Sequence, residues 1–307
     1  MTFPPTLPSV GVVVPTRDRP ELVRLTLKAI ADQDYAGEVQ VVVVHDQVPL
    51  DLDLQDLGRR PVRVCANSRT PGLAGTRNTG IMALDTELVA FCDDDDVWLP
   101  GKITAQVARL VRAPEAEMCT CSIAVLYEGR RTDRLAHTDE VHHQDLIRSR
   151  MSMLHSSTFL LRRSSLRGGI GLLDEEIPGS QNEDWELLLR ASRRRPILHV
   201  DQPLVTVRWG AASYFSRQWQ SRVDSLIWLL NRYPEINDDP VGSARVSGQI
   251  SFGLACLAQR REAIRWAMKA FRQNQREWRS FATLIVALRL MSGERLLAVL
   301  YRFGRGV

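Results

Sequence analysis

The most restrictive feature of this sequence is a short apolar run that ends in four consecutive aspartates. Leu88–Cys92 is apolar throughout, and Asp93–Asp96 follows it directly. Four adjacent carboxylates repel one another, so a compact fold rarely keeps them together without a cation or strong hydrogen-bond donors nearby. An apolar strand with an acidic end is how an α/β sheet delivers oxygen ligands to the carboxyl edge of its strands. The simpler alternative is a solvated acidic loop, and the surrounding sequence decides between them.

The segments before the acidic run have the pattern of a parallel α/β sheet. Continuous apolar runs at Val10–Val14 and Val39–Val44 are typical of strands buried on both faces. A helix beginning at Pro20 separates them, because proline fits the first turn of a helix. Further segments predict a strand at 62–65, a helix after Pro71-Gly72 and a helix beginning at Pro100. The order β-α-β-β-α-β-α indicates a doubly wound nucleotide-binding half.

The second half of the chain changes character after residue 209. Before that point the patterns predict strands at 118–126, 158–161, 197–200 and 204–207, and a helix that opens with Glu183-Asp184. The polar stretch 130–150 is expected to be a mobile or substrate-facing segment. Beyond it, apolar stripes at 254–271, 278–288 and 296–303 predict helices. We therefore expect two regions, an α/β domain over 1–215 and a helical region over 216–307.

Charge is distributed unevenly along the chain, and its C-terminal part is basic. The 307 residues carry a net charge of only +4, too little to indicate nucleic-acid binding, yet residues 241–307 hold 12 basic and 3 acidic residues. This basic part is interpreted either as a helical cap on the sheet or as an amphipathic foot on an anionic membrane surface.

The sequence also indicates a compartment. The five cysteines form no CxxC pair and indicate buried, reduced thiols. The first residues lack a signal-peptide pattern, and no run approaches about 18 consecutive apolar residues. We therefore expect a cytoplasmic protein, with peripheral contact at the inner face of the membrane as the alternative that the basic helices leave open.

Five motifs in a fixed order give the sequence a family resemblance. They are Val12–Arg17 (VVVPTR), Val41–Asp46 (VVVVHD), Gly72–Ile81 (GLAGTRNTGI), Phe91–Trp98 (FCDDDDVW) and Asn182–Leu187 (NEDWEL). Over about residues 8 to 210 the chain resembles the family 2 glycosyltransferases. The resemblance implies the GT-A fold, a Rossmann-like, doubly wound mixed sheet flanked by helices, here with a helical C-terminal appendage. It also implies inverting, metal-dependent transfer of one sugar from a nucleotide-diphospho-sugar, expected to be UDP-linked, to an acceptor hydroxyl.

The same resemblance assigns roles on the donor side. Asp95 is the expected ligand of Mn²⁺ or Mg²⁺, by similarity to the family's DxD element, and Asp93 would contact the ribose. Asp94 or Asp96 would order the loop, and the run of four leaves this register open by one position. Asp46 would hydrogen-bond the base, in a pocket that Pro15, Thr16 and Arg17 line, and Arg77 would lie near the nucleotide.

On the acceptor side, the resemblance makes Asp184 the catalytic base and Glu183 a supporting acid. An acceptor hydroxyl must lose a proton as it attacks, and a helix N-terminus favours the ionised form of a carboxylate. The alternative is that both acids only stabilise the start of the helix. His155 and Trp185 are expected near the acceptor, whose identity the sequence does not give. Because the QxxRW element and membrane helices of the family's processive members are missing, we expect a non-processive enzyme.

Two other functions stay open at this level. A sugar nucleotidyltransferase shares the fold, but such enzymes usually carry a glycine-rich loop after the first strand, and residues 15–20 contain no glycine. A non-catalytic nucleotide-sugar-binding scaffold would not need both the aspartate cluster and the Glu183-Asp184 pair.

Overall fold

A mixed β-sheet forms the body of the molecule, and helices cover both of its faces. The computed structural model describes residues 7–56, 59–209 and 218–302. Within these residues one sheet holds ten strands, eight of them in the order β3-β2-β1-β4-β9-β6-β10-β5, while β7 pairs with β6 and β8 with β10. The strands are β1 (Val10–Thr16), β2 (Val39–His45), β3 (Val62–Ala66), β4 (Leu88–Phe91), β5 (Val97–Trp98), β6 (Met118–Tyr127), β7 (Arg130–Arg134), β8 (Glu140–Val141), β9 (Leu160–Arg162) and β10 (Ile197–Arg208).

The first four strands confirm the predicted doubly wound half. β1 pairs in parallel with β2 on one side and with β4 on the other, and β2 pairs in parallel with β3. Strand order therefore reverses at β1, and the carboxyl ends of β1, β2 and β4 open onto one edge of the sheet. Ligands of open α/β sheets bind at such a switch point. Thr16, Asp46 and Asp93 all lie at this edge.

Successive residues of β1 point to opposite faces of the sheet, and each face has its own helices. Val12 and Val14 belong to the apolar cluster that includes residues of helices α1 and α3, whereas Val13 belongs to the cluster that includes residues of α2 and α6. These helices are α1 (Pro20–Ala31), α2 (Leu73–Met82), α3 (Lys102–Arg112) and α6 (Glu183–Arg194). Gly80 of α2 has no side chain because a Cβ there would lie 2.3 Å from Val13 Cγ1.

Two details of the sheet differ from the sequence prediction. Residues 197–208 form the single strand β10 instead of two short strands, because register shifts against β6 between Val200 and Val205 let one strand continue past Pro203. The strand predicted at 158–161 begins later, at Leu160, since Ser156–Thr158 forms a 3₁₀ turn, η2.

The polar stretch 130–150, expected to be a mobile or substrate-facing segment, contains regular secondary structure that the sequence pattern did not indicate. It contains strands β7 and β8 and the short helix α4 (His143–Arg148). β7 pairs antiparallel with β6, so its exposed polar residues belong to an edge hairpin. Period-two alternation is weak in a strand whose two faces are both polar, which is why the pattern did not reveal it.

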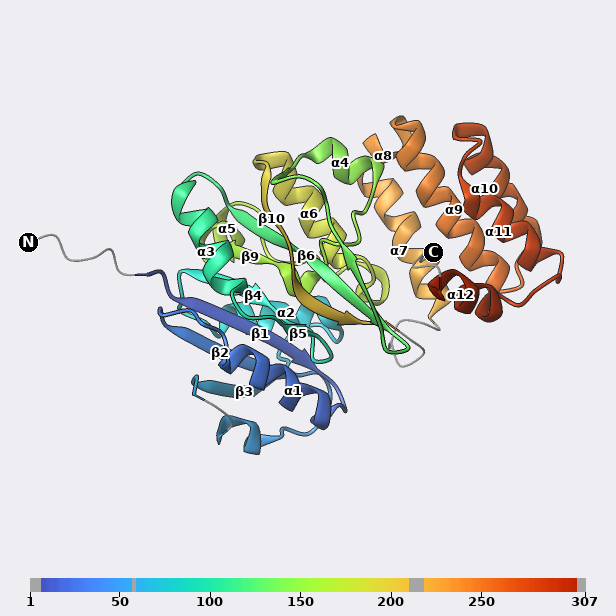
Figure 1. Ribbon diagram of the computed structural model, residues 1–307. Coiled ribbons are helices and arrows are strands. Elements are labelled where there is room, and N and C mark those ends of the chain that lie inside the picture. Colours follow the sequence, from blue (N-terminus) through green and yellow to red (C-terminus); the bar gives the residue numbers. More distant parts are fainter. Residues whose placement is uncertain (1–6, 57–58, 210–217, 303–307) are drawn as a thin grey trace, which may run out of the picture.

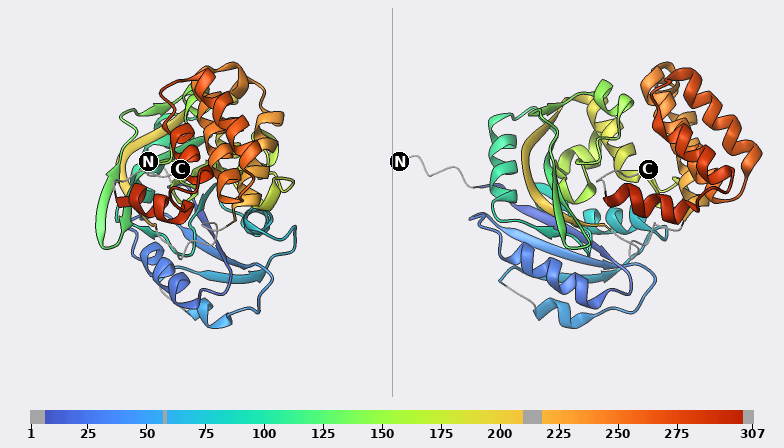
Figure 2. Two further views of the ribbon diagram at one scale, coloured as in Figure 1. Left: turned by 90° about the vertical axis from the view of Figure 1, so that its right-hand side faces the viewer. Right: turned by 45° about the vertical axis from the view of Figure 1, so that its right-hand side comes forward.

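The C-terminal part is helical, as predicted, and lies beside the sheet (Figures 1 and 2). It contains α7 (Trp219–Arg232), α8 (Glu235–Asp238), α9 (Pro240–Cys256), α10 (Arg260–Gln273), α11 (Trp278–Ala287) and α12 (Gly293–Arg302). The apolar stripe predicted over 254–271 spans two helices, because the chain turns between Cys256 and Arg260, with Ala258 in the left-handed region. The expected domain boundary at 215/216 lies outside the described residues.

These helices share an apolar core with the sheet domain. One continuous cluster contains Phe91, Phe159, Trp185 and Phe252. At the other end, the Tyr301 ring of α12 lies 5.6 Å from Tyr127 and 5.5 Å from Trp209, between ring centroids. The two regions are therefore packed together at both ends.

Two other expectations can be compared with the structure. All five cysteines are free; Cys92, Cys119 and Cys121 are buried, as predicted, whereas Cys65 and Cys256 are only partly buried. In the part of the chain that the structure describes, no helix is both long enough and apolar enough to cross a bilayer.

Candidate active site

The four aspartates after β4 point in different directions, and hydrogen bonds hold two of them against the end of β1. Thr16 donates to Asp94 Oδ2 at 2.7 Å. Arg19 Nη1 bridges Asp94 Oδ1 at 3.2 Å and Asp95 Oδ2 at 2.8 Å. Thr26 of α1 donates to the backbone carbonyls of Asp94 and Asp96, at 3.0 and 2.8 Å. The acidic run is thus built into the sheet edge and is not a solvated loop.

Asp93 and Asp96 face the opposite way, toward the turn 155–158. Ser156 donates to Asp93 Oδ2 at 3.1 Å, and Ser157 donates to Asp96 Oδ2 at 2.5 Å. His155 Nδ1 lies 3.2 Å from Asp96 Oδ2. Asp93, Asp96 and His155 each offer one ligand atom, and these atoms lie within 4.8 Å of one another, close enough to hold a metal ion. Asp95, the ligand expected from the sequence, is outside this group.

The local electrostatics show an excess of negative charge at this edge. Burial, followed by the charges of Asp96, Asp93 and Asp94, raises the pKa of Asp95 to about 7. Burial alone would lower the pKa of His155, but the carboxylate of Asp96 outweighs it and raises that pKa to about 9. Both shifts have the direction expected beside closely spaced carboxylates.

Arg77 connects the acidic run to helix α6. It extends from α2 and is completely buried, and its guanidinium donates to Asp93 Oδ1 at 2.5 Å, to Ser156 Oγ at 3.0 Å and to Glu183 Oε1. Burial raises the pKa of Glu183 above its usual range, and the charge of Arg77 opposes that rise. The network brings Asp93 and Glu183, which are far apart in the sequence, onto one guanidinium.

Asp184, the expected base, lies next to this network at the start of α6. Its Oδ2 is paired with Arg150, and its Oδ1 accepts the backbone N–H of Trp185 at 2.7 Å. The Trp185 side chain is completely buried and donates to the carbonyl of Leu146 at 3.1 Å. That placement puts Trp185 in the core and does not support the acceptor-side role expected for it.

The expected base pocket lies at the ends of β1 and β2. Asp46 Oδ1 accepts from Asn67 Nδ2 at 2.9 Å, and Oδ2 accepts from the Gly72 N–H at 3.0 Å. Arg17 is exposed, with Nη1 3.9 Å from Asp46 Oδ2, while Pro15 is buried within β1. Asp46 thus ties the end of β2 to the start of α2, and its carboxylate still faces the exposed Arg17.

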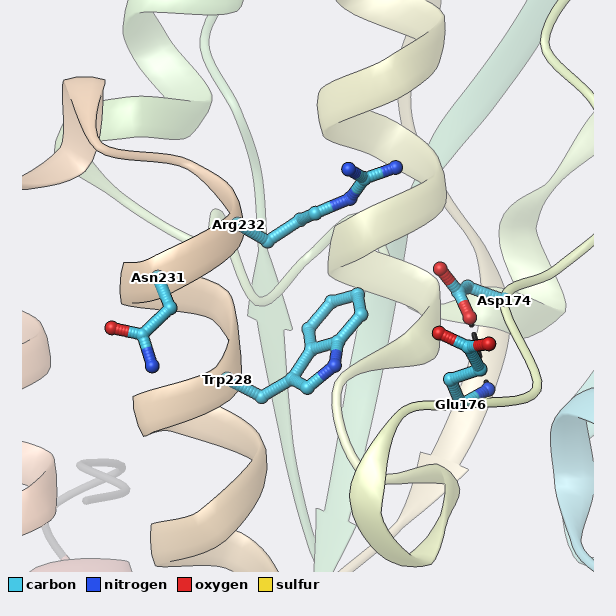
Figure 3. A pocket seen from close by; sticks show the side chains of 5 residues that line it. All are labelled: Asp174, Glu176, Trp228, Asn231 and Arg232. Atoms are coloured by element: carbon cyan, nitrogen blue, oxygen red, sulfur yellow. Dashed lines mark hydrogen bonds between the residues drawn. The ribbon is translucent and has the colours of Figure 1, made fainter.

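A separate hollow of about 330 Å³ lies between α7 and the loop before α6 (Figure 3). The Trp228 ring projects toward the loop that carries Asp174 and Glu176, and Asn231 and Arg232 complete the lining. None of these residues belongs to the acidic run or to the Arg77 network.

Sequence reasoning missed the residues that hold the predicted ones in position. Arg19 lies in the loop 15–20, of which only Pro15, Thr16 and Arg17 were assigned a role, and Ser156 and Ser157 follow His155 without any motif of their own. Arg150 comes from the polar stretch 130–150, where no motif indicates an ion pair with Asp184. Only the three-dimensional contacts reveal these four partners.

The family model for glycosyl transferase family 2 matches residues 11–169. Among curated proteins, the Escherichia coli UDP-Glc:alpha-D-GlcNAc-diphosphoundecaprenol beta-1,3-glucosyltransferase WfgD is 21% identical over 34% of this chain. The Campylobacter jejuni GalNAc(5)-diNAcBac-PP-undecaprenol beta-1,3-glucosyltransferase is 29% identical over 32% of it. These matches span only 41% and 33% of the relatives' own lengths.

Solved structures cover nearly the whole chain. S. aureus TarS 1-349 in complex with UDP-GlcNAc aligns over 92% of this chain and 91% of its own, with a TM-score of 0.61 and 16% identity. The mannosyltransferase PcManGT from Pyrobaculum calidifontis, in complex with GDP-Man and Mn²⁺, aligns over 93% and 87%, with a TM-score of 0.58 and 17% identity. At these identities the likeness concerns the fold, and the GT-A architecture expected from the sequence is confirmed.

Proposed function

Because this chain belongs to glycosyl transferase family 2, we propose that it moves one sugar from a nucleotide-diphospho-sugar to an acceptor hydroxyl, with inversion at the anomeric carbon. The observation that carries the proposal is the buried network Asp93–Arg77–Glu183, with Asp184 beside it. It joins the acidic run after β4, which could hold a cation, to the carboxylates at the start of α6. Sugar transfer from a diphosphate needs both, one for the leaving group and one for the attacking hydroxyl.

The donor is proposed to bind across the carboxyl ends of β1, β2 and β4. Asp46 would accept from the base, Pro15, Thr16 and Arg17 would surround it, and Asp93 and Asp94 would face the ribose and the diphosphate. UDP is the favoured nucleotide, since the name of one matched relative specifies UDP-Glc and one matched structure holds UDP-GlcNAc. A screen of nucleotide-sugars for released nucleoside diphosphate tests this proposal. Release from UDP-sugars supports it, and release from none of the donors would contradict it.

The acidic edge suits a hard divalent cation, Mn²⁺ or Mg²⁺. Asp93 and Asp96 supply the carboxylate oxygens that these ions prefer, and His155 supplies a nitrogen. Burial, together with the neighbouring carboxylates, raises the pKa of Asp95, and a cation would offset the negative charge of those carboxylates. Bound there, the ion would act as a Lewis acid for the departing diphosphate. Asp93, Asp96 and His155 form one candidate ligand set, and Asp95, the sequence-based candidate, is the other.

A metal-binding titration separates the two candidate ligand sets. We expect Asp96→Asn to weaken Mn²⁺ binding at least about tenfold. Removing a residue that only hydrogen-bonds a metal ligand already weakens metal binding by about 10–100-fold, and Asp96 is proposed to be a ligand itself. Asp95→Asn should weaken it less if the set is Asp93, Asp96 and His155. Electron paramagnetic resonance of free Mn²⁺ measures both affinities without turnover. The reverse order of effects would identify Asp95 as the ligand.

On the acceptor side, Asp184 is the proposed general base. It lies in the first turn of α6 and is paired with Arg150, and a carboxylate in this position can take a proton from an attacking hydroxyl. Glu183 is proposed to support it by holding Arg77. His155 would lie between the acidic run and Asp184, near the incoming acceptor.

The names of both reported curated relatives specify acceptors linked to undecaprenol through a diphosphate. A lipid-linked acceptor would suit the C-terminal helices, where exposed apolar side chains alternate with exposed arginines. Met268 and Phe271 of α10 are exposed and apolar. So are Phe281 and Leu284 of α11, and Leu288, which directly follows α11. Phe271 and Phe281 pack edge to face with centroids 6.0 Å apart, so α10 and α11 present one surface. We propose that this surface contacts an anionic membrane.

Liposome flotation tests the membrane contact. We expect the wild-type chain to float with vesicles that contain anionic lipid and to stay behind with purely zwitterionic vesicles, because the basic residues need negative headgroups. Phe281→Ser, at a side chain 52% exposed, should reduce flotation without unfolding the chain. The control is Leu25→Ser on α1, 48% exposed and in the sheet domain. Equal flotation of both variants would contradict the proposed surface.

A further inference from the structure

Four arginines from different elements converge beside the proposed base. Arg150 follows α4, Arg222 lies on α7, Arg245 on α9 and Arg279 on α11. Burial, together with the charges of Arg279 and Arg150, lowers the pKa of Arg245 to about 9. Burial and the same two charges lower the pKa of Arg222. Arg150 and Arg279 thus lie close enough to both Arg222 and Arg245 for their charges to act on them.

Two members of this cluster are paired with carboxylates. Asp184 pairs with Arg150, and Glu277 pairs with Arg279 at 2.8 Å. Among the described residues, Arg245 forms no ion pair, and it is only 9% exposed. Leaving a buried charge without a counter-charge is costly, so a fold that keeps one usually provides a partner for it.

The orientation of Arg245 leaves one of its donors unused. Its guanidinium stacks on the Trp185 ring, 4.7 Å from the centroid, and Nε donates to the carbonyl of Arg148 at 3.2 Å. Nη2 is buried and has no hydrogen-bond partner among the residues that the structure describes. A buried, charged and unsatisfied donor among other guanidinium groups is the pattern that an oxyanion would complete, since arginine binds phosphate through charge-assisted hydrogen bonds.

We propose that the arginine cluster, formed by Arg150, Arg222, Arg245 and Arg279, binds a phosphate or diphosphate group of the acceptor. The inference rests on the proposed function, and it adds the chemical class of the acceptor. Arg245 lies against Trp185, and Arg150 contacts Asp184, which directly precedes Trp185 in the sequence. A phosphate held by Arg245 and Arg150 would therefore anchor the acceptor close to the carboxylate proposed to take its proton.

A calorimetric titration of the full chain with inorganic pyrophosphate tests the cluster directly. EDTA is present throughout, so that pyrophosphate cannot bind through a metal at the acidic edge. We expect wild-type binding that weakens with added salt, at least about tenfold weaker binding in Arg245→Gln, and recovery to within about threefold in Arg245→Lys, which keeps the charge. Arg265→Gln on α10, whose side chain is 73% exposed, should bind like wild type.

The sources of such a group are distinguished by a second arm with geranyl diphosphate. Binding at least about tenfold tighter than that of pyrophosphate indicates a prenyl-linked diphosphate, and equal binding indicates phosphate on a non-lipid acceptor. Circular dichroism melting verifies that Arg245→Gln is folded, and Arg279→Gln provides a second removal of charge from the cluster. The proposal is overturned if wild type does not bind pyrophosphate, or if folded Arg245→Gln and Arg279→Gln bind it like Arg265→Gln.

Failure of this inference can be told apart from failure of the proposed function. Anion binding through Arg245 in a chain that releases nucleoside diphosphate from no donor would uphold the anion site and refute sugar transfer. Transfer with an unchanged KM for the acceptor in Arg245→Gln would uphold sugar transfer and refute the acceptor site.

Discussion

Asp184→Asn is expected to bind the nucleotide donor like wild type and to transfer sugar about 10²–10⁴-fold more slowly, the usual contribution of a general base. Asparagine keeps the shape of the side chain and can still accept the N–H of Trp185, but it cannot take a proton from the attacking hydroxyl. The loss should therefore fall on kcat, with little change in the affinity for the donor.

Initial rates of nucleoside diphosphate release, together with calorimetric titration of UDP, separate these two quantities. Asp85→Asn is the matched control, because the Asp85 side chain is 98% exposed and its ion pair among the described residues is with Arg163, away from Asp184 in the sequence. Glu183→Gln should have the smaller kinetic effect, as Glu183 is proposed to act through Arg77 and not on the acceptor. Turnover of Asp184→Asn within about twofold of wild type would eliminate Asp184 as the base and leave Glu183 as the remaining carboxylate of the pair.

The sheet could be predicted because the residues that specify each of its first strands are adjacent in the sequence. Val10–Val14, Val39–Val44 and Leu88–Cys92 are continuous apolar runs, and proline marks the start of α1. Such runs can be buried only between two layers of helices, so strand type, parallel pairing and the shared carboxyl edge follow together. Strand β7 was missed for the converse reason, since all of its residues are polar, most are exposed, and they carry no apolar period.

The internal order of the acidic run could not be predicted in the same way. Four identical side chains differ only in the direction that the turn gives them, and a turn of this length is set by distant partners. Thr16 and Arg19 draw Asp94 and Asp95 toward β1, while Ser157 draws Asp96 toward η2. These partners lie some 60 to 80 positions away in the sequence. A metal assignment within the run therefore needs the fold.

Arg77 illustrates the same limit at the centre of the site. The motif Gly72–Ile81 suggested an arginine near the nucleotide, but the structure buries its side chain completely and satisfies it with Asp93 and Glu183. No local pattern indicates that a helix residue will meet a carboxylate 106 positions later. Its contacts indicate that Arg77 joins the acidic run to the start of α6 and positions Asp93 and Glu183.

Arg77→Met should consequently lower the free energy of unfolding by about 3–5 kcal/mol, the usual cost of removing one partner from a buried ion pair. Methionine retains an unbranched apolar side chain against Phe91, whose ring centroid lies 5.7 Å from the guanidinium carbon. Packing is thus largely preserved, and the loss comes from leaving the buried Glu183 and the partly buried Asp93 without a counter-charge. Denaturant unfolding of the two proteins under identical conditions gives the difference.

A double variant separates charge from packing. Adding Glu183→Gln to Arg77→Met removes one of the stranded carboxylates, so the double variant should be more stable than Arg77→Met alone, a coupling that independent sites would not show. Arg265→Met, at a side chain 73% exposed on α10, should stay within about 0.5 kcal/mol of wild type. If Arg77→Met is no less stable than Arg265→Met, the buried network is not what holds β4 and α6 together. Asp93 and Glu183 would then have to be held in place by Ser156 and the start of α6 alone.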